Sequence, residues 1–108
     1  MFRIVITGLA KNDIQYTHDW WAEHHSKANA AMWYQGVYTA IQSLEVMPER
    51  CSLAPEQNLA EQALRQLLYG VRSRPTHRIV FLIDGSDVVI LAVRHLSQDS
   101  LLLDDLFE

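Results

Sequence analysis

The stretch 76–95 constrains the fold more than any other part of this 108-residue chain. It contains two apolar runs, rich in β-branched residues and each long enough for a strand, on either side of the sequence Asp84-Gly85-Ser86-Asp87. An Asp-Gly pair between such runs is a strong signal for two antiparallel strands joined by a tight turn. We therefore expect a β-hairpin, and we expect both of its faces to be covered because its interior is almost entirely Val, Ile, Leu and Phe.

The open end of the expected hairpin is cationic. His77 and Arg78 begin the first strand, while Arg94 and His95 end the second, so strand pairing brings these residues to the same end. Whether the two arginines share a face depends on the register, because a slip of one residue exchanges the faces. An apolar stem with a cationic end is typical of a binding surface. The alternative is a set of solvated charges that pair with acids of the turn and the C-terminal tail.

The periodicity of the remaining chain predicts an α+β fold. Apolar residues recur at three- and four-residue steps in two segments, which indicates consecutive helices joined at a tight break. The expected elements are a strand at 2–7, helices at 9–24 and 26–47, a surface crossing at 48–58 with one helical turn near 57–60, a strand at 63–69, the hairpin at 76–95, and a short helix starting at 99. This order, β-α-α-β-β-β, favours a helical hairpin packed on one face of a mostly antiparallel sheet. The length predicts a single domain over 1–108.

Features of the helical segments carry expectations about packing. Trp20 and Trp21 place one indole toward the core and the other beside it, and a core role is favoured over a platform for stacking bases. Gly36 lies inside the second helix, where it costs about 1 kcal/mol relative to alanine, and this indicates close helix packing as much as a functional role. The histidines on or just after the first helix match no compact metal-binding motif.

The net charge of −4 hides a local basic region. Residues 65–95 contain five arginines and two aspartates, whereas residues 96–108 contain four acids and no base. A protein that binds nucleic acid mainly through phosphates usually has a strongly positive balance, so this class is not indicated.

The single cysteine, Cys51, cannot form an internal disulfide and is expected to be a reduced loop residue. Without a secretory signal or a run of about 18 apolar residues, we expect a cytoplasmic protein that does not enter a membrane.

The candidate site is a set of cationic residues on and around the hairpin. Guanidinium groups bind phosphate or carboxylate well, and a histidine can move a proton near neutral pH. The set consists of Arg65, Arg72, Arg74, His77, Arg78, Arg94 and His95. No glycine-rich phosphate loop, recognisable nucleophile–histidine motif or metal motif stands out, so we expect no metal, no cofactor and no ordinary metabolic enzyme.

These residues resemble one known family along nearly the whole chain. The chain is similar to the RelE/ParE superfamily, the toxin halves of bacterial type II toxin-antitoxin modules, which are often labelled plasmid stabilisation proteins. The pieces that carry the resemblance are Ala10-Lys11-Asn12-Asp13-Ile14, Trp20-Trp21-Ala22-Glu23, Pro48-Glu49-Arg50, Leu68-Tyr69-Gly70, and the strand sequences at 77–85 and 89–95. The family fold agrees with the order of elements predicted from periodicity.

The resemblance implies one of two activities. Family members that cleave messenger RNA on the ribosome carry catalytic arginines at the positions matching Arg78 and usually Arg94, and His95 would then be the acid or base. Those nucleases look strongly basic and often have a tyrosine just beyond the last strand, whereas this chain is acidic and has no tyrosine after Tyr69. The chain is therefore closer to the ParE branch, whose members bind DNA gyrase and cleave no RNA.

A binding toxin uses the cationic set differently. Its expected target-binding residues are Arg65, Arg72, Arg74, His77, Arg78 and Arg94. A ribosome-dependent endoribonuclease and an inactive toxin-fold interaction protein remain the alternatives.

The resemblance also implies partners. A cognate antitoxin wraps the toxin in this family and the complex represses its own operon, so contact with operator DNA is expected only through the antitoxin. The candidate antitoxin-binding residues are the apolar side chains of the tail, Leu102, Leu103, Leu106 and Phe107. The target is DNA gyrase or the ribosome, no membrane is involved, and a homodimer stays open.

Overall fold

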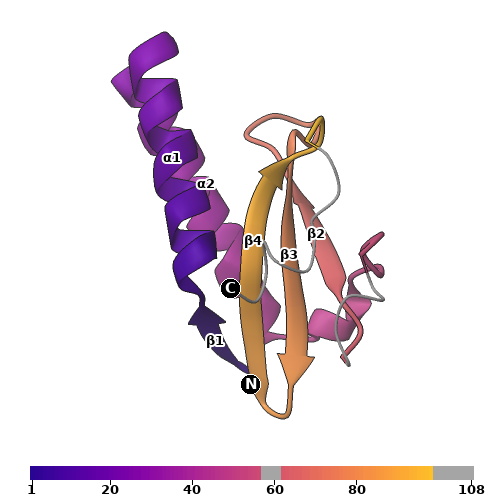
Figure 1. The fold of residues 1–108 in the computed structure, drawn as a ribbon. Coiled ribbons are helices and arrows are strands. Elements are labelled where there is room, and N and C mark those ends of the chain that lie inside the picture. Colours follow the sequence, from indigo (N-terminus) through magenta and orange to yellow (C-terminus); the bar gives the residue numbers. More distant parts are fainter. Residues whose placement is uncertain (57–61, 99–108) are drawn as a thin grey trace.

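The expected hairpin forms the centre of the sheet in the computed structural model, which describes residues 1–56 and 62–98 (Figure 1). The helices and strands are β1 Arg3–Ile6, α1 Gly8–His24, α2 Lys27–Gln42, β2 Arg65–Tyr69, β3 His77–Asp84 and β4 Asp87–His95, with short 3₁₀ turns at Ser43–Glu45 and Pro48–Arg50. Asp84 pairs with Asp87 across the hairpin turn, and Gly85 has a φ of 61°. Glycine adopts this left-handed conformation without a steric penalty, so the Asp-Gly signal is confirmed.

The architecture is two helices on an open, mixed sheet, which confirms the predicted α+β class. The four-stranded sheet has the order β1-β4-β3-β2, in which β1 runs parallel to β4 and the other neighbours are antiparallel. The helices lie side by side on one face of the sheet (Figure 1). Both begin at hydroxyl caps, since the Thr7 side chain accepts from the Ala10 N–H and the Ser26 side chain accepts from the Asn29 N–H.

Both faces of the β3–β4 hairpin are buried, as the apolar strands predict. The face beneath the helices belongs to a core cluster that includes Trp33, Val37, Ile41, Ile79, Phe81, Ile90 and Val93. Trp33, which the periodicity does not single out, is the largest fully buried side chain among the described residues. The opposite face holds a second cluster formed by Ala54, Leu64, Val80, Leu82, Leu91 and Ala92.

The segment after α2 differs from its prediction. The helix ends at Gln42, and the chain continues through 3₁₀ turns instead of reaching Met47 in α-helix. The predicted surface crossing is wrong in part, because Cys51, Ala54 and Glu56 are buried. Main-chain bonds hold this segment against β2 and the residue before it, from the Ala54 N–H to the Leu64 carbonyl and from the Gln66 N–H to the Ser52 carbonyl, and the Glu56 carboxylate pairs with Arg78. The helical turn expected at 57–60 and the helix expected from 99 lie outside the described residues.

The β4 edge is closed by side chains where β1 stops. β1 pairs only with the first half of β4, up to Ile90. Beyond it, the Asp13 carboxylate on α1 accepts the Val93 N–H at 2.9 Å, and the Thr7 hydroxyl donates to the Ile90 carbonyl at 2.8 Å. These bonds satisfy backbone groups of an otherwise open strand edge and fix α1 against β4.

Gly36 is required by the approach of α2 to β2, as its position within a helix indicates. A methyl group at Gly36 would overlap the Tyr69 hydroxyl and lie 2.9 Å from the ring carbon Cζ. Gly36→Ala should therefore lower the free energy of unfolding by about 1–3 kcal/mol, because overpacking outweighs the gain of about 1 kcal/mol in helix propensity. Urea denaturation measures this change.

The matched control is Gly8→Ala, where an added Cβ meets no atom within 4 Å. A second substitution, Tyr69→Phe, should recover part of the loss in the Gly36→Ala background because it removes the overlapping hydroxyl. If Gly36→Ala were as stable as Gly8→Ala, close packing at this glycine would be refuted.

Candidate functional site

The hairpin register brings the cationic pairs together at the open end. His77 pairs with His95, and Arg78 pairs with Arg94. Directly opposed residues of antiparallel strands share a face, so each pair lies on one side of the sheet. Arg78 and Arg94 therefore start from the same face of the sheet. Their side chains, however, run in different directions.

Arg78 is buried in an ion pair on the face opposite the helices. Its Nη1 donates to Glu56 Oε1 at 2.8 Å and to Gln66 Oε1 at 3.4 Å, and its Nη2 donates to Glu56 Oε2. The Arg78 and Glu56 side chains are 8% and 2% exposed. This fork-to-fork geometry is the strong form of the arginine–carboxylate pair. Contact between Arg78 and a target or an RNA phosphate would therefore require this pair to open.

Arg94 turns toward the first helix. Its Nε lies 3.5 Å from Asp13 Oδ2, the carboxylate that also accepts the Val93 N–H, and its side chain is 20% exposed. Arg94 is therefore a partly accessible cation tied to α1, and its guanidinium does not join that of Arg78.

The remaining arginines separate into two places. Arg65 lies opposite Phe81, far from the open end, and its Nη1 donates to the Cys51 carbonyl at 2.7 Å. Arg72 and Arg74 are exposed in the connection between β2 and β3, next to the open end. Of the predicted arginine set, Arg72 and Arg74 are thus the members that are exposed at this end.

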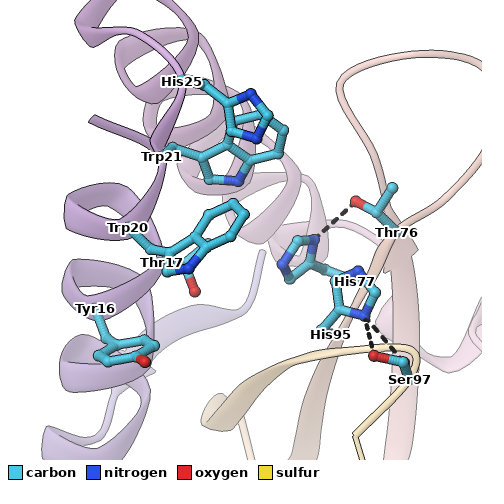
Figure 2. A pocket seen from close by; sticks show the side chains of 9 residues that line it. All are labelled: Tyr16, Thr17, Trp20, Trp21, His25, Thr76, His77, His95 and Ser97. Carbon is cyan, nitrogen blue, oxygen red and sulfur yellow. Dashed lines mark hydrogen bonds between the residues drawn. The ribbon is translucent and has the colours of Figure 1, made fainter. Parts of the chain in front are cut away.

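A cavity of about 480 Å³ lies between α1 and the open end of the hairpin. Its lining residues are Tyr16, Thr17, Trp20, Trp21, His25, Thr76, His77, His95 and Ser97 (Figure 2). We name this cavity the aromatic pocket. The prediction of a core role is wrong for Trp20, whose side chain is 41% exposed, while Trp21 is half-buried against the core as expected. Adjacent helix positions point about 100° apart, so only one of the two indoles can face the sheet.

His77 and His95 form the sheet side of the aromatic pocket. Their rings meet edge to face at a centroid distance of 5.0 Å, and the Thr76 hydroxyl lies 2.7 Å from His77 Nδ1. Burial, followed by repulsion from His95, lowers the pKa of His77 to about 4. His77 is therefore neutral near pH 7 and adds no positive charge to the open end, whereas His95 is exposed.

Sequence reasoning found the two halves of this pocket but not their union. The Trp20-Trp21 pair and the terminal histidines of the hairpin are visible in the sequence, yet their meeting depends on how far α1 extends along β4.

Within residues 1–56 and 62–98, no cluster of three or more His, Cys, Asp or Glu side chains is arranged to hold a metal ion. No helix in these ranges has the length and apolar character to cross a membrane. Cys51 is a buried free thiol in the connection before β2.

Comparisons with known proteins give a family match and structural matches. A family model described as the ParE toxin of the type II toxin-antitoxin system, parDE, matches residues 4–100. The chain is similar to a solved structure described as the chromosomal ParDE TA system from P. aeruginosa, with a TM-score of 0.72, 16% identity, and coverage of 90% of this chain and 98% of that one. It is also similar to the toxin-antitoxin complex RelBE2 from Mycobacterium tuberculosis, with a TM-score of 0.47, 23% identity, and coverage of 87% and 96%. A search of curated proteins gives no significant match.

The buried Glu56–Arg78 pair should be important for stability. Glu56→Gln removes the charge that compensates Arg78, and breaking such a pair typically costs about 3–5 kcal/mol in free energy of unfolding. Urea denaturation at neutral pH measures the loss, with the exposed Glu49→Gln as the matched control. Replacing both partners by apolar residues, Glu56→Leu with Arg78→Met, should recover much of the stability. Equal stability of the Glu56→Gln and Glu49→Gln variants would contradict the pair described here.

Proposed function

Because the chain belongs to the ParE toxin family, we propose that this toxin of a type II toxin-antitoxin system acts by binding DNA gyrase and does not cleave RNA. The observation that supports this choice most strongly is the burial of Arg78 against Glu56. A nuclease must present cationic donors to the phosphate on which charge develops. Both terminal nitrogens of the Arg78 guanidinium already donate to Glu56, so this group is unsuited to that task.

Further features support binding over cleavage. Arg94 is directed toward Asp13, away from Arg78, so the two arginines that the nuclease reading needs do not converge on one phosphate. His95 lies on the face opposite to Arg78, because adjacent strand residues alternate sides. The net charge of −4 and the lack of any tyrosine beyond Tyr69 add to the case against a ribosome-bound nuclease.

The proposed contact surface for gyrase is the exposed part of the cationic end. Arg72 and Arg74 are free to reach a partner, and the partly exposed Arg94 lies on the neighbouring strand end. Exposed charges of one sign accelerate association with an oppositely charged surface and orient the encounter. Arg65 and Arg78 are committed to contacts inside the chain, and His77 is largely buried with its Nδ1 bonded to Thr76, so we assign all three supporting roles in this surface.

The proposed neutralising partner is a cognate antitoxin. The family description names a two-component system, and the P. aeruginosa structure is described as a ParDE system. We assign part of the contact to Leu102, Leu103, Leu106 and Phe107, which lie outside the described residues. Any contact with operator DNA would then pass through the antitoxin.

A supercoiling assay with purified gyrase tests this proposal. The protein should inhibit supercoiling, and Arg72→Ala and Arg74→Ala should each raise the concentration needed for half inhibition by about tenfold, which corresponds to about 1.4 kcal/mol of binding energy. Lys11→Ala, an exposed charge at the start of α1, is the control and should change little. Normal supercoiling at saturating protein would remove gyrase as the target. Codon-positioned cleavage of messenger RNA would restore the nuclease, and harmless expression would favour an inactive interaction protein.

A further inference from the structure

Trp20 is a large aromatic side chain held in place and left open on the aromatic pocket. Its ring stacks on His24 at a centroid distance of 4.7 Å and an interplanar angle of 17°. His24 is itself fixed, since its Nδ1 lies 3.0 Å from the Trp20 carbonyl oxygen. His24 does not line the pocket, whereas the Trp20 ring does and remains 41% exposed. The indole therefore packs against His24, which is not part of the pocket, and it also meets the pocket rings of Trp21 and His25 at centroid distances of 5.8 Å and 5.4 Å. Its exposed part lies on the cavity (Figure 2).

The opposite side of the pocket carries oriented polar ring edges. The Ser97 N–H donates to His95 Nδ1 at 3.0 Å, so the neutral His95 ring carries its proton on Nε2. The Thr76 hydroxyl lies 2.7 Å from His77 Nδ1, so this nitrogen of His77 is occupied whichever of the two groups donates. Within the described part of the chain, neither Nε2 has a hydrogen-bond partner. Each ring thus offers one unused polar nitrogen.

The lining selects an uncharged ligand. None of the nine lining residues is Asp, Glu, Lys or Arg. His77 also stays neutral at neutral pH, because burial depresses its pKa. An ionised group in this cavity would lose hydration without gaining an opposite charge, so a bound phosphate or carboxylate is disfavoured. The surfaces that remain are aromatic faces with a few neutral donors and acceptors.

We propose that the aromatic pocket binds a flat, neutral heteroaromatic ring of the nucleobase class, stacked on Trp20 with its polar edge toward His77 and His95. The volume of about 480 Å³ lies in the usual range for small-ligand sites. Aromatic side chains stack on any base, and the unused ring nitrogens supply hydrogen bonds that a purely apolar slot lacks. This site goes beyond the gyrase-binding role and does not depend on it. The base belongs either to a free nucleoside or to a single strand of nucleic acid.

A titration followed by NMR chemical shifts tests the proposal. Adenosine, guanosine, cytidine and uridine are added in turn to the wild-type protein, and toluene serves as an apolar probe. At least one nucleoside should give saturable shifts at the Trp20 indole N–H with a Kd below about 1 mM. No saturable shift from any nucleoside up to about 10 mM would overturn the proposal, as would saturable binding of toluene alone.

Variants separate the stacking face from the polar edge. Trp20→Ala should weaken nucleoside binding at least tenfold, while Leu68→Ala, an exposed leucine of β2 outside the pocket, should leave it unchanged. His95→Phe keeps the ring but removes the donor, so it should weaken nucleoside binding several-fold and leave toluene binding intact. Wild-type nucleoside affinity in His95→Phe would refute the predicted polar edge.

Comparing a trinucleotide with its nucleosides shows whether the bound base comes from a nucleic acid strand or from a free nucleoside. If a trinucleotide binds more tightly than its nucleosides and loses affinity with rising salt, the site takes a base from a nucleic acid strand, and the exposed Arg72 and Arg74 of the β2–β3 connection are the candidate phosphate contacts. If nucleoside and trinucleotide bind equally, the ligand is a free nucleoside. Both results support a nucleobase site.

Discussion

The pairing of β3 with β4 determines what every residue at the open end of the hairpin can do. The strands pair in simple register from the turn until one residue, Leu91, is left without a partner. Such a bulge shifts all later pairs by one position. The shift places His95 opposite His77 and Arg94 opposite Arg78. Without it, His77 would face Arg94, and each face of the sheet would mix a histidine with an arginine.

The separation of the two pairs gives the open end two chemically different faces. Beneath the helices, His77 and His95 join the exposed indole of Trp20 to form an aromatic pocket whose lining contains no Asp, Glu, Lys or Arg. On the other face, Arg78 is neutralised by Glu56 and buried. Because of this geometry, the Arg78 guanidinium is not available to bind a phosphate, whereas the aromatic pocket is accessible from solvent. A binding toxin is consistent with both faces, whereas a nuclease would need the arginine face to be exposed.

The local signals in the sequence predict the elements well, because helix and strand periods and the Asp-Gly turn act over short distances. They cannot predict the site, because its contacts depend on features that have no local signature. The bulge at Leu91 occurs within a continuous apolar run, and Glu56 lies 22 residues from Arg78 in a segment that looks like a surface loop. Trp20 and Trp21 are identical residues at neighbouring helix positions, so the sequence does not distinguish them. Only the orientation of α1 decides which indole is buried. The charge on Arg78 suggests an exposed side chain, but pairing with the Glu56 carboxylate allows it to be buried.

We propose that this ParE-family toxin acts on a DNA-processing target and leaves translation intact. The most direct measurement is induced expression in bacteria without an antitoxin, followed by incorporation of labelled thymidine and labelled amino acids during the first minutes. Thymidine incorporation should fall first while amino-acid incorporation continues. An earlier fall in amino-acid incorporation would contradict this proposal, because cleavage of RNA would require Arg78 to be released from its buried pair with Glu56.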